Sequence, residues 1–268
     1  VSSIRPDTFG NIWFGHNVGG ISRMSDGVIE KVPTSGIASS TINAMAVDGH
    51  GGIWALAQNN GILHVGPNGH VKLAYAADGT LWYSLLALPD GRILAGTNAG
   101  LVLLSTSGDT LKAMGDLGAV THAPVRAVIR STLGDRIFVG TEDEGIRSFR
   151  LQDGRPKEIN ILGADKGLGA LQVRDLTLGA NGQLIVGTRG DGAYEIGLGS
   201  DGSTSLLHYD AQNGLGTDDV DVVFTDREND LWFARVGLAL ARLLDRSVVY
   251  YAADADEADV QALASRGH

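Results

Sequence analysis

The chain has 268 residues, with 38 glycines, 43% hydrophobic and 19% charged residues, and no cysteine. This composition is typical of a folded, turn-rich protein, and it excludes disulfides and thiolate metal sites. A formal net charge of −10 without basic clusters argues against a nucleic-acid partner, and no apolar run is long enough to span a bilayer.

A motif that recurs at intervals of roughly 40 to 47 residues dominates the sequence. In each copy a glycine or polar turn precedes an apolar cluster of β-type residues, and a second turn follows it. The central residues of the clusters are Trp13, Trp54, Leu94, Phe138, Ile185 and Trp232. Strand-type repeats of this length predict propeller blades, because one four-stranded unit cannot bury its own faces.

The repeat predicts an all-β fold, a β-propeller of six four-stranded blades that spans residues 1–251 as one domain. The predicted blades cover residues 1–41, 42–81, 82–124, 125–172, 173–219 and 220–251. A seven-bladed or partial ring is the alternative, because the first unit starts with an inner strand and the last ends with an outer one. We also expect the chain to be a piece of a longer protein. Residues 252–268 predict an acidic tail, either a short helix or a disordered linker.

The last unit shows the four strands most clearly, as the apolar runs 220–224, 231–234, 238–243 and 247–251. Asp-Gly and Asn-Gly pairs recur at the expected hairpins, where they supply positive φ angles. These pairs are Asp26-Gly27, Asn68-Gly69, Asp90-Gly91, Asp153-Gly154, Asn181-Gly182 and Asp201-Gly202. Another signal, the pairs Gly36-Ile37, Gly167-Leu168 and Gly214-Leu215, predicts the crossovers between blades.

The residues of the repeat are, in order, Gly-Leu, a short polar stretch, Val, then Asp, Gly and Leu/Ile-Trp-Phe-Gly. This pattern resembles the two-component regulator propeller repeat. Its best copies run from Gly36 to Gly61 and from Gly214 to Leu238. The resemblance implies a sensor propeller outside the cytoplasm, in a membrane-bound receptor with a kinase or cyclase inside. The run from Gly10 to Phe14 is also similar to streptogramin-lyase-type propellers, which implies an enzyme as the alternative.

The sequence contains few signs of catalysis. Its seven histidines are scattered, none forms a pair with helical metal-ligand spacing, and no Gly-x-Ser-x-Gly elbow occurs. The run from Gly197 to Gly202 matches a dinucleotide fingerprint by letters, but it falls at a strand hairpin, where that motif cannot work. The repeated tryptophans are in phase with the repeat and predict core residues. We expect no catalytic residue, no metal and no cofactor.

The candidates for function are polar positions that hold a different residue in each repeat, although the apolar residues around them keep the same spacing. One follows the first apolar residue of each inner strand, and others lie in the loops after the second strands, all at the predicted channel mouth. The predicted ligand-binding residues are Asn43, Tyr83, Arg126, Arg174, Asp221, His16, Gln58, Glu142, Arg189 and Arg235. One interpretation is a hydrated mouth that tolerates any polar residue. The other is a pocket in which Arg126, Arg174 and Arg189 bind a carboxylate or phosphate.

These observations predict a non-catalytic ligand-sensing or protein-interaction module, the periplasmic or otherwise extracytoplasmic sensor part of a two-component-type receptor. The expected partner is a small polar or anionic ligand or an adjacent receptor domain, without membrane contact by this segment itself, and a homodimer could form through the full-length receptor. The alternatives are a propeller lyase or hydrolase, with an acid–base group such as His16 beside Glu142, and a protein-interaction scaffold.

Overall fold

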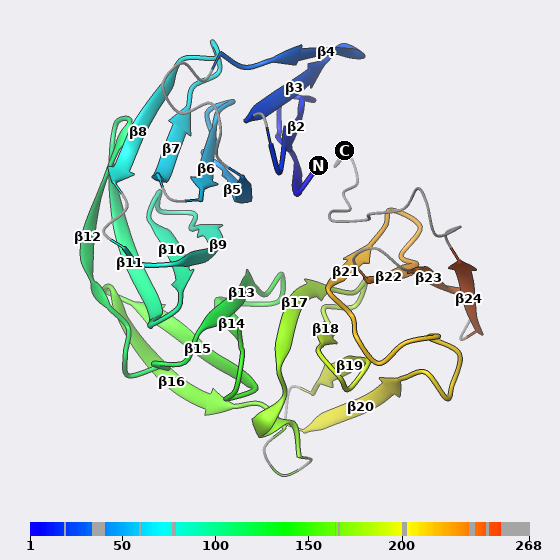
Figure 1. Ribbon diagram of the computed structural model, residues 1–268. Coiled ribbons are helices and arrows are strands. Elements are labelled where there is room, and N and C mark those ends of the chain that lie inside the picture. The colour runs from blue at the N-terminus through cyan, green and yellow to red at the C-terminus, as the bar shows by residue number, and fades with distance from the viewer. Residues whose placement is uncertain are drawn as a thin grey trace. The chain divides into compact units, whose positions relative to one another are not determined.

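The computed structural model describes residues 1–18, 20–33, 41–58, 60–76, 79–163, 165, 167–199, 203–235, 239–244 and 247–252. The described residues form two compact units, the first from Val1 to Gly118 and the second from Ala119 to Ala252. Each unit contains three antiparallel sheets of four strands (Figure 1).

The first unit holds the first three blades, in which each strand pairs with the next along the chain. Blade 1 comprises β1 (Ser3–Pro6), β2 (Ile12–Gly15), β3 (Ile21–Ser25) and β4 (Val28–Lys31). Blade 2 comprises β5 (Ile42–Val47), β6 (Ile53–Ala57), β7 (Gly61–Val65) and β8 (Val71–Ala76). Blade 3 comprises β9 (Trp82–Ala87), β10 (Ile93–Thr97), β11 (Gly100–Ser107) and β12 (Thr110–Asp116). The first strands of successive blades pack together, β1 on β5 and β5 on β9.

The second unit repeats this arrangement, with β13 packed on β17 and β17 on β21. Blade 4 comprises β13 (Val125–Arg130), β14 (Arg136–Thr141), β15 (Ile146–Gln152) and β16 (Arg155–Ile161). Blade 5 comprises β17 (Val173–Leu178), β18 (Leu184–Thr188), β19 (Ala193–Leu198) and β20 (Thr204–Tyr209). Blade 6 comprises β21 (Val222–Thr225), β22 (Leu231–Arg235), β23 (Ala239–Leu244) and β24 (Ser247–Ala252).

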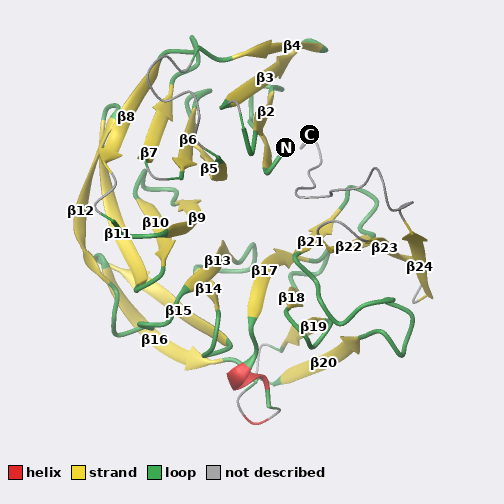
Figure 2. Ribbon diagram, in the orientation of Figure 1, coloured by secondary structure: helices red, strands yellow, loops and turns green. Residues whose placement is uncertain are grey.

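The predicted fold class, a β-propeller with six four-stranded blades, is confirmed. Figure 2 shows strands throughout both units, with a 3₁₀ turn, η2 (Leu168–Ala170), before β17. Within the described residues, the structure contains no helix with the length and apolar character that crossing a bilayer requires.

The hairpins form where the sequence predicts them, because their residues adopt positive φ angles. Asp26 and Gly27 have φ angles of 50° and 80° between β3 and β4, and Asp153 and Gly154 have 50° and 74° between β15 and β16. Positive φ at both central residues is the geometry of a type I′ turn, which suits the twist of a two-strand hairpin. The predicted turn at Asp201-Gly202 lies outside the described residues.

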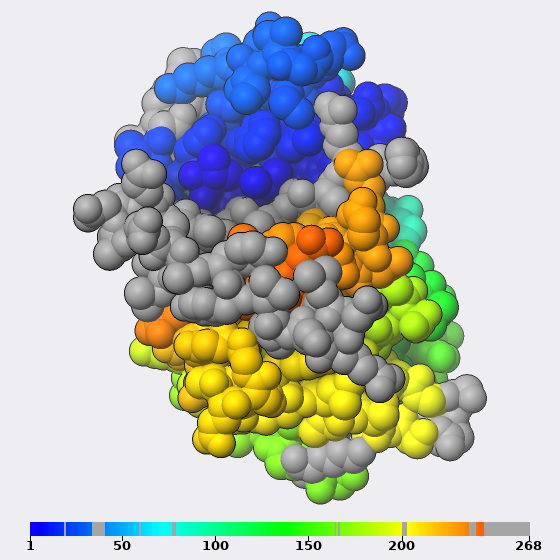
Figure 3. All heavy atoms as spheres, turned by 90° about the vertical axis from the view of Figure 1, so that its right-hand side faces the viewer, coloured from blue at the N-terminus to red at the C-terminus, as the bar shows by residue number. Residues whose placement is uncertain are grey.

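The predicted crossovers between blades are visible in the second unit. Leu168 and Leu215 are both buried, and each belongs to the apolar core beside the following blade. Residues 211–214, which precede Leu215, are exposed. Figure 3 shows the part of the second unit around residue 210 in yellow on the surface. The signal at Gly36-Ile37 lies outside the described residues. The predicted tail, 252–268, begins with Ala252, which is the last residue of β24, and the rest of it lies outside the described residues.

The repeated tryptophans and glycines build the contact between blades. Trp13 is fully buried and Trp54 is 4% exposed, as predicted for core residues, whereas Trp232 is only half-buried beneath the Arg242 guanidinium. A Cβ atom on Gly140, at the end of β14, would lie 2.3 Å from Cγ1 of Val173 in the next blade. The glycine therefore lets the next inner strand approach closely.

Candidate functional site

A pocket of about 310 Å³ lies between blades 2 and 3 of the first unit. Its polar side chains are those of Asn43, Gln58, Thr80 and Tyr83, and its larger apolar ones are those of Leu56, Leu81 and Trp82. Three predicted site residues, Asn43, Gln58 and Tyr83, thus line one cavity. Because no described lining residue is a carboxylate, histidine, lysine or arginine, the pocket suits an uncharged polar ligand.

A β-bulge places the central polar residue in each wall of the pocket. In blade 2 the pairing of β5 with β6 shifts between Ile42 and Ala44, so that Asn43 is the extra residue. In blade 3 the pairing of β9 with β10 shifts where Trp82 faces Thr97 and Ser84 faces Gly96, which makes Tyr83 the extra residue. A bulge bends the strand and redirects a side chain, and such bulges are common beside binding sites.

The indole of Trp82 has an unused hydrogen-bond donor in the wall of the pocket. Its side chain packs edge-on against Tyr75, with 5.4 Å between the ring centroids, and the residue is 7% exposed. Within the described residues, the buried Nε1 atom of Trp82 has no hydrogen-bond acceptor. Leaving a buried N–H group without a partner costs about 1–3 kcal/mol.

In the second unit, the predicted site residue Arg126 already binds a carboxylate of its own blade. One terminal nitrogen, Nη2, lies 3.0 Å from both oxygens of Glu142, and both side chains are partly buried. Because this ion pair neutralises the guanidinium, an external anion would compete with Glu142. Binding of an anion by Arg126 with Arg174 stays a prediction.

The other predicted residues of the second unit have different surroundings. Arg235 is paired with Asp219 at 3.2 Å and donates to the Thr217 hydroxyl. Arg174 and Asp221 are half-buried and Arg189 is exposed. At the two positions where blade 4 has Arg126 and Glu142, blade 5 has two arginines, Arg174 and Arg189.

The acid–base pair of the enzyme alternative has structural partners inside each unit. His16 of the first unit lies 3.0 Å, through Nε2, from the Ser22 hydroxyl, and burial with the charge of Lys31 holds the pKa of His16 below its usual value. Glu142 of the second unit is engaged by Arg126. No group of three or more His, Cys, Asp or Glu side chains in the described residues could hold a metal ion.

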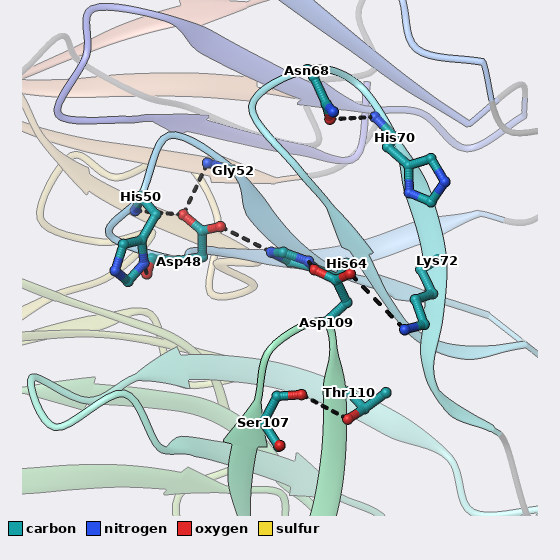
Figure 4. Close-up of polar contacts among 10 residues, drawn as sticks. All are labelled: Asp48, His50, Gly52, His64, Asn68, His70, Lys72, Ser107, Asp109 and Thr110. Carbon is teal, nitrogen blue, oxygen red and sulfur yellow. Dashed lines mark hydrogen bonds and ion pairs between the residues drawn. The ribbon is translucent and has the colours of Figure 1, made fainter.

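A carboxylate–histidine–carboxylate cluster in the first unit was not predicted from the sequence (Figure 4). The imidazole of His64, on β7, lies 2.9 Å from Asp48 Oδ2 through Nε2 and 2.8 Å from Asp109 Oδ1 through Nδ1. It also stacks on Trp54 at 4.2 Å between centroids. Since both ring nitrogens are engaged, this histidine connects blade 2 to blade 3 and offers no free nitrogen for catalysis.

The signal for this cluster was an aspartate six residues before each repeated tryptophan. Asp7 accepts a hydrogen bond from Trp13 Nε1 at 3.0 Å, and Asp226 accepts one from Trp232 Nε1 at 2.7 Å. In blade 2 the corresponding Asp48 binds His64 instead. The aspartate therefore holds the first hairpin of the blade, and its role is architectural.

The fold defines the chain as a β-propeller, and comparisons with solved structures agree with this class. No protein-family model and no curated protein sequence matches the chain. The structure is similar to the extracellular domain assigned to a hybrid two-component system of B. thetaiotaomicron, at a TM-score of 0.72 and 16% identity over 95% of the chain. The chain spans 34% of that domain.

Two other solved structures cover most of the chain. A protein from Lactobacillus plantarum has a TM-score of 0.68, 14% identity, and coverage of 94% of this chain and 83% of its own. A protein of Bacteroides fragilis assigned as a 6-phosphogluconolactonase has a TM-score of 0.63, 13% identity, and coverage of 95% and 83%. At these identities the likeness establishes the propeller fold, which occurs in receptors and enzymes alike. The resemblance to the two-component regulator repeat stays a prediction at the family level.

Proposed function

We propose that the chain is a non-catalytic recognition module from the extracytoplasmic part of a two-component-type receptor. The observation that carries the proposal is the pocket between blades 2 and 3, where two amides and a phenol face apolar walls. Side-chain amides both donate and accept hydrogen bonds, so they recognise hydroxyl and amide groups without charge. The ligand is a small uncharged polar molecule, such as a sugar.

The lining argues against a reaction in the pocket. General acid–base catalysis needs a group that exchanges protons near the working pH, usually a histidine or a carboxylate. The described lining offers amides, a hydroxyl, a phenol and apolar side chains. Such a set binds and orients a ligand, which is what a sensor requires.

A receptor role also agrees with the length of a similar solved structure. The similar B. thetaiotaomicron domain is extracellular and about three times as long as the matched segment. We infer that ligand binding changes the packing of this module on a neighbouring receptor domain, and that a homodimer forms through the full-length receptor. A scaffold that only binds proteins would leave the pocket unused.

The binding test uses uncharged saccharides as probes, with glucose, N-acetylglucosamine and maltose set beside the charged analogue glucuronate. We expect saturable binding of an uncharged probe by calorimetry, and its loss in the double variant Asn43→Ala, Gln58→Ala. Gln152→Ala is the control, because it removes an exposed amide from blade 4. A wild-type protein that binds none of the probes, or a double variant that binds as well as the wild type, would count against the proposal.

An enzyme is the second candidate, because a fold neighbour is assigned as a lactonase. Hydrolysis of gluconolactone by the purified chain, followed by the release of acid at constant pH, tests it. Turnover above the spontaneous rate that persists in His16→Ala would also exclude the predicted acid–base role of His16.

A further inference from the structure

Blades 4 and 5 share one backbone arrangement at the ends of their first two strands. In blade 4, Val125 pairs with Thr141, Arg126 is the bulge residue, and the N–H of Glu142 donates to the carbonyl of Pro124 at 2.9 Å.

In blade 5 the same positions hold different side chains on the same backbone. Val173 pairs with Thr188, Arg174 is the bulge residue, and the N–H of Arg189 donates to the carbonyl of Gln172 at 2.9 Å. Arg174 thus corresponds to Arg126, and Arg189 corresponds to Glu142.

The side chains at these two positions have opposite charges in blade 4, whereas both are positively charged in blade 5. Glu142 supplies blade 4 with a carboxylate that Arg126 binds through both oxygens. Within the described residues, neither Arg174 nor Arg189 takes part in an ion pair. Two cations at neighbouring positions repel each other, and the described part of blade 5 supplies no carboxylate to offset this repulsion.

The nearest carboxylates in sequence are already engaged. Asp175 accepts hydrogen bonds from the backbone N–H groups of Leu176 and Val223, at 2.9 and 3.1 Å. Asp191 accepts one from the Tyr194 hydroxyl at 2.7 Å. Blade 5 therefore has the cationic half of the blade 4 arrangement without its anionic half.

We propose that Arg174 and Arg189 form a binding site for a carboxylate supplied from outside the chain, which takes the place that Glu142 fills in blade 4. A guanidinium binds a carboxylate through two parallel charge-assisted hydrogen bonds, and a second guanidinium adds attraction. The site lies in the second unit, and its occupancy is independent of the pocket between blades 2 and 3.

The test follows the side-chain Nε–H signals of arginine by nuclear magnetic resonance while acetate is added at constant ionic strength. Acetamide, which has the same shape without the charge, and inorganic phosphate are the comparison probes. We expect a saturable acetate-dependent shift of the Arg174 signal, little response to acetamide, and weaker binding of phosphate.

The variant Arg189→Glu rebuilds the blade 4 pair inside blade 5, so that Arg174 gains an internal carboxylate. We expect it to weaken acetate binding by about tenfold or more, because a strong charge-assisted contact is replaced by competition. Arg227→Glu makes the same change of charge at an exposed position of the second unit and leaves acetate binding unchanged.

If Arg189→Glu does not fold, Arg189→Gln removes the cation alone, and we expect it to weaken acetate binding as well. The proposal is overturned if acetate causes no saturable shift, or if acetamide shifts the signal equally. It is also overturned if phosphate binds and acetate does not, or if the folded Arg189 variant binds acetate like the wild type.

Discussion

His64 of blade 2 and Asp109 of blade 3 are joined by a 2.8 Å hydrogen bond across 45 residues of sequence. The other imidazole nitrogen binds Asp48 of the first hairpin of blade 2, as Figure 4 shows. Asp48 and His64 are both buried, whereas Asp109 is half exposed. One side chain therefore holds both the hairpin of its own blade and the neighbouring blade.

Replacing His64 by phenylalanine should destabilise the first unit. The aromatic ring can still stack on Trp54, but the buried Asp48 carboxylate loses the donor at Oδ2. We expect a loss of about 2 kcal/mol in the free energy of unfolding, because a buried charged acceptor is left partly unpaired. Urea denaturation measures it. Asp109→Asn is the matched control and should cost less, and equal stability of His64→Phe and the wild type would contradict the account.

Stability should fall in acid through Asp48. Burial alone would raise the pKa of Asp48, but hydrogen bonds from His64 and from the N–H groups of His50 and Gly52 outweigh it and hold that pKa below its usual value. A carboxyl with a lower pKa in the folded state stabilises the fold above its unfolded-state pKa. This contribution is lost as the pH falls through the folded-state pKa.

Urea denaturation between pH 7 and pH 2.5 tests this dependence. The variant Asp48→Asn should be less stable at pH 7 and should lose less stability on acidification than the wild type. A variant whose pH dependence matches that of the wild type would show that Asp48 is not a source of the acid sensitivity.

Adding a single methyl group at Gly140 should disrupt the contact between blades 4 and 5. The new Cβ would lie 2.3 Å from Val173 Cγ1, so the inner strand of blade 5 would have to move. We expect Gly140→Ala to cost about 1–3 kcal/mol, as overpacking of a core does. At Gly169 the nearest atom to such a Cβ is 3.8 Å away, so Gly169→Ala is the control. Thermal unfolding of the two variants side by side should separate them clearly.

The propeller could be predicted from the sequence because its determinants are local and recur in phase. The dipeptide Asp26-Gly27 is enough to predict the hairpin that it forms. Trp13 is predicted as a core residue because it lies at the repeat interval from Trp54. The repeat also aligns Asn43 and Tyr83, because each directly follows the first apolar residue of its inner strand. These features need no knowledge of distant contacts.

The pairing of side chains could not be predicted in the same way. Arg126 looked like a ligand-binding cation, and its ion pair with Glu142 depends on how the loop after β14 returns to the start of β13. His64 looked like one of seven scattered histidines, and its second partner comes from another blade. Such contacts depend on the three-dimensional approach of segments, which the residue pattern of one repeat does not encode.

The most direct test of the account is a crystal structure of the protein soaked with the uncharged saccharide that binds most tightly in solution. We predict electron density for the sugar between blades 2 and 3, with hydrogen bonds to the side-chain amides of Asn43 and Gln58 and a contact with Tyr83. Density for the sugar at another place, with the pocket between blades 2 and 3 empty, would contradict the account.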